Sequence, residues 1–351
     1  MNIKESQEFH SERRGRTVTA TIEKSKTPMI WLDTSVLIDF AKIRVGENIE
    51  PVRAQRLKRL WSAVRKAIRS EKLVCPEWDQ AHEFESDRFG KLLPGIVSDL
   101  SCGAHCQAYA GVKDQQIFIG LKAYIAGADT MHVPASIHFE EDPLEVVREA
   151  KKTGYIIDAE TPRVTEWLEK AKLDKLETQE AIEELRQAYT AKNQTFEQQL
   201  ALERIGESDS MMTMMEEFRR RKRQGTVDFW QLMNVQGFFI HMQAYKHFGG
   251  PSGDLAADLG GLYSFMRSPY YWELPIQDVA CRISADLVVK PFEVKSGDSM
   301  DNQHLSMAIP VAHYVVADKA MVDRCERLGI GKKWNTKIFA TRTLVSCPGN
   351  T

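Results

Sequence analysis

The stretch MIWLDTSVLIDF, residues 29–40, joins the two kinds of element that we expect to alternate along this chain. Its four apolar residues MIWL are typical of a short buried strand. The polar trio Asp33, Thr34 and Ser35 suits the start of a helix, which the following VLIDFAKI continues. Asp33 is therefore expected at the carboxyl end of a strand.

The same order continues after this stretch. Apolar residues recur at spacings of three and four between positions 51 and 70, which predicts a helix; they are Val52, Leu57, Leu60, Trp61, Val64 and Ile68. Residues 72–75 form a short apolar run, and Pro76 opens a segment that suits another helix start and carries Glu77, Glu83 and Glu85. The pattern so far is strand, helix, strand, helix.

The middle of the chain has a different composition. Residues 161–223 are rich in Glu, Lys, Gln, Ala, Leu and Arg, which is typical of long exposed helices. We interpret this region as a helical insertion. The last hundred residues return to the α/β order, with a helix opening near Asp301, a strand at 314–317 and a final strand at 336–340. Asp318 then lies at the end of a strand, as Asp33 does, and parallel sheets place functional sites at that edge.

Composition sets limits on function. The 351 residues are 43% hydrophobic, enough for a real core, and 47 basic residues nearly balance 49 acidic ones. Contact with nucleic acid would therefore need a local basic patch. The longest apolar runs fall short of the roughly 18 residues that span a bilayer, and the N-terminus is polar, so we expect a cytoplasmic protein that does not bind membranes. Six widely spread cysteines are expected to be reduced.

Three segments carry a family resemblance: LDTSVLIDFA, LVCPEWDQAHEFE and SMDNQHLSMAIPVAHYVVADKAM. With these the chain resembles the PIN domain superfamily of nucleases, over residues 28–92 and 265–341, and would be a large prokaryotic member. The resemblance implies an α/β fold, a three-layer α/β/α sandwich with a central parallel sheet. Here a mostly helical insertion would interrupt it. The expected parts are a polar tail (1–27), a first PIN-like part (28–150), the insertion (151–240) and a second PIN-like part (241–351).

The resemblance also implies an acidic site that binds Mg²⁺ or Mn²⁺. Carried over by position, its acids are Asp33, Glu83, Asp301 and Asp318, and we expect all four to be metal ligands and catalytic. Glu77 and Glu85 are alternatives for the second position, and Asp298 is an alternative for the third. Magnesium and manganese prefer oxygen ligands, so clustered carboxylates suit them.

Substrate contacts are expected at two further places. A basic run in the insertion could hold phosphates; its candidates are Arg219, Arg220, Arg221 and Arg223. His304 lies one helical turn after Asp301 and is a candidate for contact with phosphate. We therefore expect a metal-dependent endoribonuclease, of toxin or phage-defence type, that binds RNA. The alternatives are a nuclease for single-stranded or structured DNA and an inactive PIN-like scaffold for a protein partner. A homo-oligomer or a regulatory protein partner is compatible with each.

Overall fold

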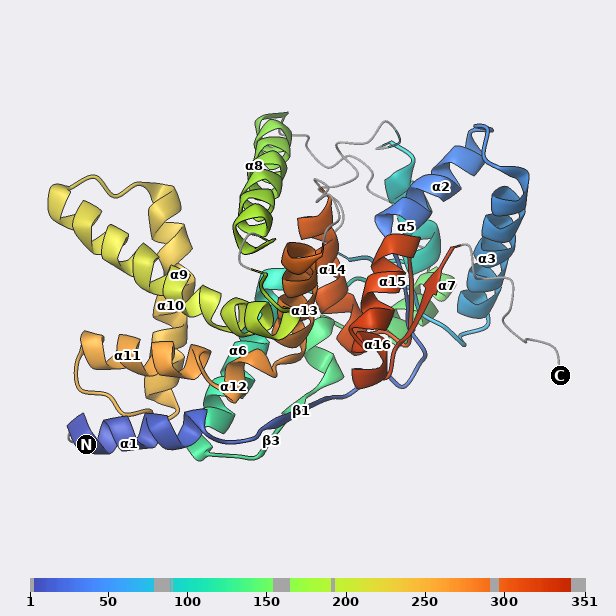
Figure 1. The fold of residues 1–351 in the computed structure, drawn as a ribbon. Coiled ribbons are helices and arrows are strands. Elements are labelled where there is room, and N and C mark those ends of the chain that lie inside the picture. The colour runs from blue at the N-terminus through green and yellow to red at the C-terminus, as the bar shows by residue number, and fades with distance from the viewer. Residues whose placement is uncertain are drawn as a thin grey trace. The chain divides into compact units, whose positions relative to one another are not determined.

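The computed structural model describes residues 3–78, 89, 91–153, 165–190, 193–290 and 297–341 of the chain (Figure 1). Helix makes up 68% of it, in 15 helices within the described ranges, beside two small sheets of two and three strands. The expected three-layer α/β/α sandwich with a central parallel sheet is therefore wrong. Strands of three or four residues provide too little surface to form a central layer covered by helices on both faces.

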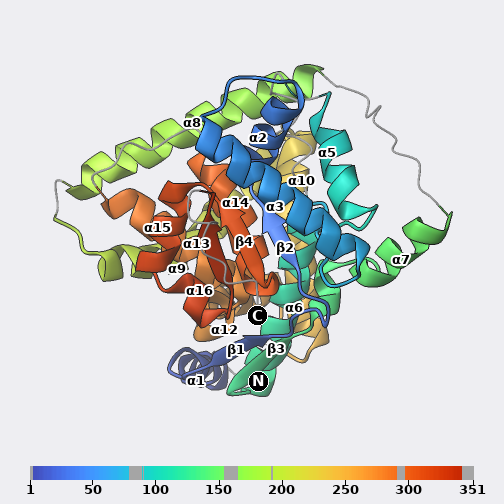
Figure 2. The same ribbon diagram turned by 90° about the vertical axis from the view of Figure 1, so that its right-hand side faces the viewer.

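The larger sheet is parallel and has the order β2-β4-β5. It consists of β2 (Ile30–Leu32), β4 (Tyr314–Ala317) and β5 (Lys337–Ala340). Leu32 pairs with Val316, and Ala317 pairs with Ala340. The expected strand at 72–75 contributes one isolated parallel bridge, between Met29 and Val74. Figure 2 shows β2 and β4 side by side. The smaller sheet pairs β1 (Thr19–Ile22) with β3 (Thr130–Val133).

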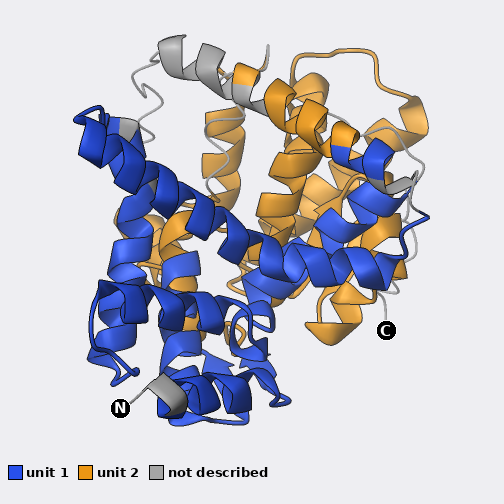
Figure 3. Ribbon diagram, turned by 60° about the vertical axis from the view of Figure 1, so that its left-hand side comes forward, with its two compact units in different colours: residues 1–21, 113–133, 185–292 blue, residues 22–112, 134–184, 293–351 orange. Residues whose placement is uncertain are grey.

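The chain divides into two compact units, each assembled from three separate stretches (Figure 3). Unit 1 comprises residues 1–21, 113–133 and 185–292, and unit 2 comprises residues 22–112, 134–184 and 293–351. The helices α6 (Tyr109–Ala126) and α8 (Thr165–Thr190) contain a unit boundary. The small parallel sheet belongs to unit 2.

Unit 1 is helical around an aromatic core. Tyr124, Tyr245, Phe265 and Tyr270 are fully buried there. A Cβ atom on Gly261 would lie 2.3 Å from the Tyr245 ring, so glycine is what lets that ring pack. Besides parts of α6 and α8, its helices are α1 (Ile3–Arg14), α9 (Phe196–Gln224), α10 (Phe229–His247), α11 (Leu255–Met266), α12 (Pro269–Trp272) and α13 (Pro275–Val289).

In the described part of unit 2, four helices contact the small three-stranded sheet. α2 and α14 contact β4, while α15 and α16 contact β5. Trp31 on β2 and Ile309 on α14 are fully buried. Besides parts of α6 and α8, its helices are α2 (Thr34–Arg44), α3 (Pro51–Arg69), α5 (Leu93–Ser101), the 3-10 helix η1 (Ala135–His138), α7 (Pro143–Thr153), α14 (Asp298–Val311), α15 (Lys319–Arg327) and α16 (Ile330–Lys333).

Lys24, which follows β1, forms hydrogen bonds at the amino-terminal side of this sheet. The Lys24 ammonium donates hydrogen bonds to the Ala312 and Asn335 carbonyl oxygens, at 2.5 and 2.8 Å, and to the Thr336 hydroxyl at 2.7 Å. Burial lowers the pKa of Lys24 to about 8. The acidic residues that follow β2 and β4 lie at the opposite edge. Within the described ranges, no helix has the length and apolar character needed to cross a membrane.

Candidate functional site

Two of the expected acids share one edge of the parallel sheet. Asp33 follows β2 and Asp318 follows β4, its neighbour in the sheet. The Asp33 amide donates to the Val316 carbonyl oxygen at 2.9 Å, which extends the β2–β4 pairing by one residue. A strand spacing of about 4.8 Å and a rise of about 3.3 Å per residue place the two Cα atoms about 6 Å apart. The sheet thus brings together residues that are 285 positions apart in the sequence.

Both carboxylates also cap a helix. Asp33 is the N-cap of α2, and its Oδ2 atom accepts hydrogen bonds from the Ser35 amide, at 3.1 Å, and from the Ser35 hydroxyl. Asp318 is the N-cap of α15, and its Oδ1 atom accepts from the Ala320 and Met321 amides at 2.7 and 3.2 Å. The positive ends of the α2 and α15 helix dipoles therefore stabilise the negative charge of these two carboxylates. These bonds also fix the orientation of both carboxylates.

The third position lies in the first turn of α14. Asp298 and Asp301 are both there, and α14 contacts β4. Asp298 is buried, with one carboxylate oxygen 4.0 Å from the guanidinium of Arg324 on α15. Asp301 is half-buried. The assignment of the third position to Asp301, with Asp298 as its alternative, stays a prediction.

The second position falls on residues of which only one is described. Glu83 and Glu85 lie outside the described residues, whereas Glu77 lies beside Leu32, the residue before Asp33, in the lining of a small hollow. The Glu77 amide donates to the Ala104 carbonyl oxygen at 2.8 Å, which fixes its backbone. Burial raises the pKa of the Glu77 carboxyl, and the nearby His105 partly opposes this. Perturbed carboxyl pKa values are common at functional sites, and structural groups also show them, so Glu77 stays a candidate for the second position.

The donor chemistry suits a divalent cation, although the described residues do not complete a site. Among them, no group of three or more His, Cys, Asp and Glu side chains is arranged to hold a metal ion. Asp33 and Asp318 present carboxylate oxygens, the ligand type that Mg²⁺ and Mn²⁺ prefer. For Asp318, the hydrogen bonds within the described part of the chain reach Oδ1 and leave Oδ2 available. Two carboxylates are too few ligands for such an ion, so a metal site at this edge stays a prediction.

The expected substrate-binding residues lie in different units. The basic run is the last turn and a half of α9, in unit 1, where Arg220 and Arg221 both form ion pairs with Glu217. Basic side chains at the carboxyl end of a helix also interact favourably with the helix dipole, so helix stability alone accounts for their position. His304 is buried on α14 in unit 2, one turn after Asp301. Phosphate contact by the arginines or by His304 stays a prediction.

A basic surface that the sequence motifs do not indicate lies on α3. The helix α3 carries seven Lys and Arg residues and no Asp or Glu between Pro51 and Arg69. The apolar spacing of this segment predicts the helix correctly but does not indicate its charge. Charge of a single sign along one helix would have been the signal.

Comparison of the chain with protein-family models, with curated proteins and with solved structures found no match.

Proposed function

We propose that the protein hydrolyses phosphodiester bonds of nucleic acid, RNA before DNA, with the help of Mg²⁺ or Mn²⁺ held at the sheet edge. One observation carries the proposal. Asp33 and Asp318 come from distant parts of the sequence and follow neighbouring parallel strands that are in register. Parallel sheets generally bind their ligands at this edge. The resemblance of these segments to PIN-domain nucleases supports the same activity.

The residues of the chain would supply the metal ligands and hold them in place. Asp33 and Asp318 would bind the ion, with Asp301 and one of Glu77, Glu83 and Glu85 as further ligands. A bound ion of this kind lowers the pKa of a water molecule and stabilises the leaving oxygen of the phosphodiester. The Ser35 hydroxyl holds the Asp33 carboxylate, and two backbone amides of α15 hold Asp318. Such fixed ligands need little rearrangement during the reaction.

A cleavage assay with defined oligonucleotides tests the proposal. Unpaired and hairpin RNA, and DNA of the same sequences, would be incubated with the full chain in Mn²⁺, in Mg²⁺ and in excess chelator. We expect cleavage of RNA with either ion, loss of cleavage in chelator, and recovery when Mn²⁺ is added in excess. Cleavage of DNA alone would correct the substrate class. Full activity in chelator, or no cleavage with either ion, would contradict the proposal.

The third acid can be assigned in the same assay. With Asp301 as the third ligand, Asp301→Asn should abolish cleavage, whereas Asp298→Asn, which removes the carboxylate beside Arg324, should lower it less. Asp298→Asn also removes one partner of that buried pair, so its melting temperature should fall. The opposite order of the two effects on cleavage would assign the third position to Asp298.

A second function has one observation in its favour. The hydrogen bonds of Asp33 and Asp318 are those of ordinary N-caps, so both acids have a structural role without a metal ion. An inactive scaffold for a protein partner is therefore the alternative. It predicts that Mn²⁺ leaves the melting temperature of the protein unchanged, since an ion that does not bind cannot stabilise the folded state.

A further inference from the structure

The helix α3 has one buried face and one strongly basic face. Leu57, Val64 and Ile68 are buried and attach the helix to unit 2. Lys58, Arg59, Lys66 and Arg69 are exposed, and none of them has an ion-pair partner among the described residues. A row of solvated cations with no acid on the same helix produces a local positive field in a protein whose net charge is only -2.

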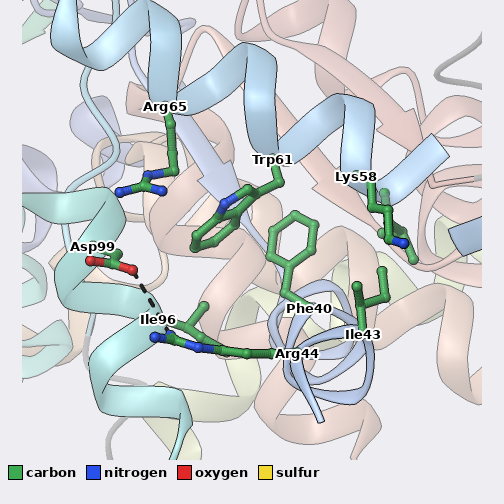
Figure 4. Close-up of a pocket in the computed structure, with 9 residues that line it drawn as sticks. Phe40, Ile43, Arg44, Lys58, Trp61, Arg65, Ile96 and Asp99 are labelled. Carbon is green, nitrogen blue, oxygen red and sulfur yellow. Dashed lines mark ion pairs between the residues drawn. The ribbon is translucent and has the colours of Figure 1, made fainter. Parts of the chain in front are cut away.

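A hollow with aromatic walls lies next to this face (Figure 4). Its volume is about 340 Å³, at the small end of ligand pockets, which run from about 300 to 1,000 Å³. Phe40 of α2 and Trp61 of α3 form one wall, with ring centroids 5.0 Å apart, and Ile96 of α5 adds apolar surface. The Arg65 guanidinium lies over the Trp61 ring, 5.5 Å from its centroid.

Cations surround this hollow and continue from it along α3. Arg44, Lys58 and Arg65 line the hollow, together with Asp99, which lies 3.9 Å from Arg44. Two further hollows, of about 480 and 210 Å³, share Arg65 and Arg69 with each other. They add Lys66 and Lys151, and Lys151 pairs with Glu71. We name these three hollows the α3 groove; its lining in the described structure has six cations and one carboxylate.

We propose that the α3 groove binds single-stranded nucleic acid. Lys58, Arg65, Lys66 and Arg69 would contact successive phosphates, and the hollow beside Trp61 would receive an unpaired base. The combination of a basic track with an aromatic surface is the one that single strands require, because phosphates and base faces alternate along them. A duplex offers no exposed base face to stack on Trp61, and a flat anionic membrane surface would not fill a concave hollow.

The α3 groove would give the proposed nuclease a surface for its substrate. Asp33 caps α2, and Phe40 lies seven residues further along the same helix, which corresponds to about 10 Å at 1.5 Å per residue. A strand held at Trp61 could therefore also reach the acidic edge of the sheet. The inference deepens the proposed function, but it concerns binding alone. It can be tested in chelator, where cleavage does not occur, so the two proposals can fail separately.

The experiment measures binding of a fluorescently labelled, unstructured RNA oligonucleotide to the full chain in chelator over a range of salt concentrations. The test variant is K58Q/K66Q/R69Q, and the matched control K122Q/K246Q/K332Q removes the same charge from exposed lysines elsewhere. The test variant should reduce the slope of log affinity against log salt by about 2, since each charge contributes about 0.7 on single strands. If both proteins converge at 1 M salt, this makes binding about 100-fold weaker at about 0.1 M. The control should keep the wild-type slope.

The aromatic wall needs its own variants. Trp61→Leu should weaken binding by roughly 5- to 150-fold with an unchanged salt slope, because stacking carries no charge. Trp61→Phe keeps a ring in place and should lose less, and the circular dichroism spectrum of each variant shows whether it is folded. Equal losses in the test and control charge variants would overturn the proposal. So would wild-type affinity in both Trp61 variants, or binding of the groove to anionic lipid vesicles but not to RNA.

Discussion

Replacing Asp318 by asparagine and, separately, by alanine distinguishes a helix cap from a metal ligand. The Asp318 carboxylate accepts two backbone hydrogen bonds at the start of α15. Asparagine caps helices about as well as aspartate, whereas alanine costs about 1 kcal/mol. A metal ligand behaves differently, because both substitutions remove the negative charge that binds the cation. The asparagine variant should therefore keep its stability without metal and lose its response to metal.

The expected temperature shifts follow from the size of the chain. Unfolding entropy of about 2.1 cal/mol/K per residue over 351 residues gives about 0.7 kcal/mol/K for one cooperative transition. Loss of the cap in Asp318→Ala should then lower the melting temperature by about 1 to 2 °C. Manganese at a hundred times its dissociation constant stabilises the wild type by about 2.7 kcal/mol, or about 4 °C.

Melting curves with and without Mn²⁺ for the wild type and both variants make the comparison. Asp323→Asn is the matched control, since it removes a carboxylate from the exposed face of the same helix. It should keep the full manganese shift. A full shift in Asp318→Asn would refute the assignment of Asp318 as a ligand and leave it as a cap.

Three more predictions follow from the structure. Burial raises the pKa of Glu77, so the stability that its neutral form gives is complete below pH 4.5 and is lost as pH rises through the folded-state pKa. Glu77→Gln should therefore raise the melting temperature at pH 7. An unchanged or lower melting temperature would count against this. Burial lowers the pKa of His138 from 6.5 to about 4, so stability present above pH 6.5 is lost as pH falls toward 4, by roughly 3 kcal/mol. The loss should be smaller in His138→Gln, and equal slopes of stability against pH would contradict it. Replacing Arg220, Arg221 and Arg223 by glutamine should weaken binding of all RNA sequences alike and flatten its salt dependence if the run contacts phosphates, whereas an unchanged slope would leave it a solvated helix end.

Individual helices and strands could be predicted from the sequence more reliably than their arrangement in the fold. The strand at 314–317 and the helix beginning after Asp33 are confirmed, because a short apolar run and a polar cap decide such elements locally. The prediction of a central sheet is wrong, because apolar runs alone do not show whether they form strands or helices. Most of the buried apolar residues, such as Phe265 and Ile309, lie on helices, and a short apolar run alone does not distinguish a buried helix from a strand.

Part of the candidate site could be predicted from the sequence because local strand ends determine it. Acids after two apolar strands predict a shared edge when the strands are parallel neighbours, and Asp33 and Asp318 have this arrangement. The sequence places Asp298 and Asp301 one helical turn apart, but no spacing rule predicts that Arg324 of α15 lies 4.0 Å from Asp298. The hollow at Trp61 combines residues from α2, α3 and α5, so only the packing of these helices reveals it.

The most direct test of the proposed function is a single-turnover cleavage measurement on labelled RNA in saturating Mn²⁺ with Asp33→Asn and Asp318→Asn. Both substitutions keep an N-cap and remove one charge, so the fold should remain intact. We predict that each variant loses cleavage while its circular dichroism spectrum and its RNA affinity in chelator match those of the wild type, and that Asp323→Asn cleaves normally. Wild-type cleavage rates in both Asp33→Asn and Asp318→Asn would contradict the proposal that these acids hold the catalytic metal ion.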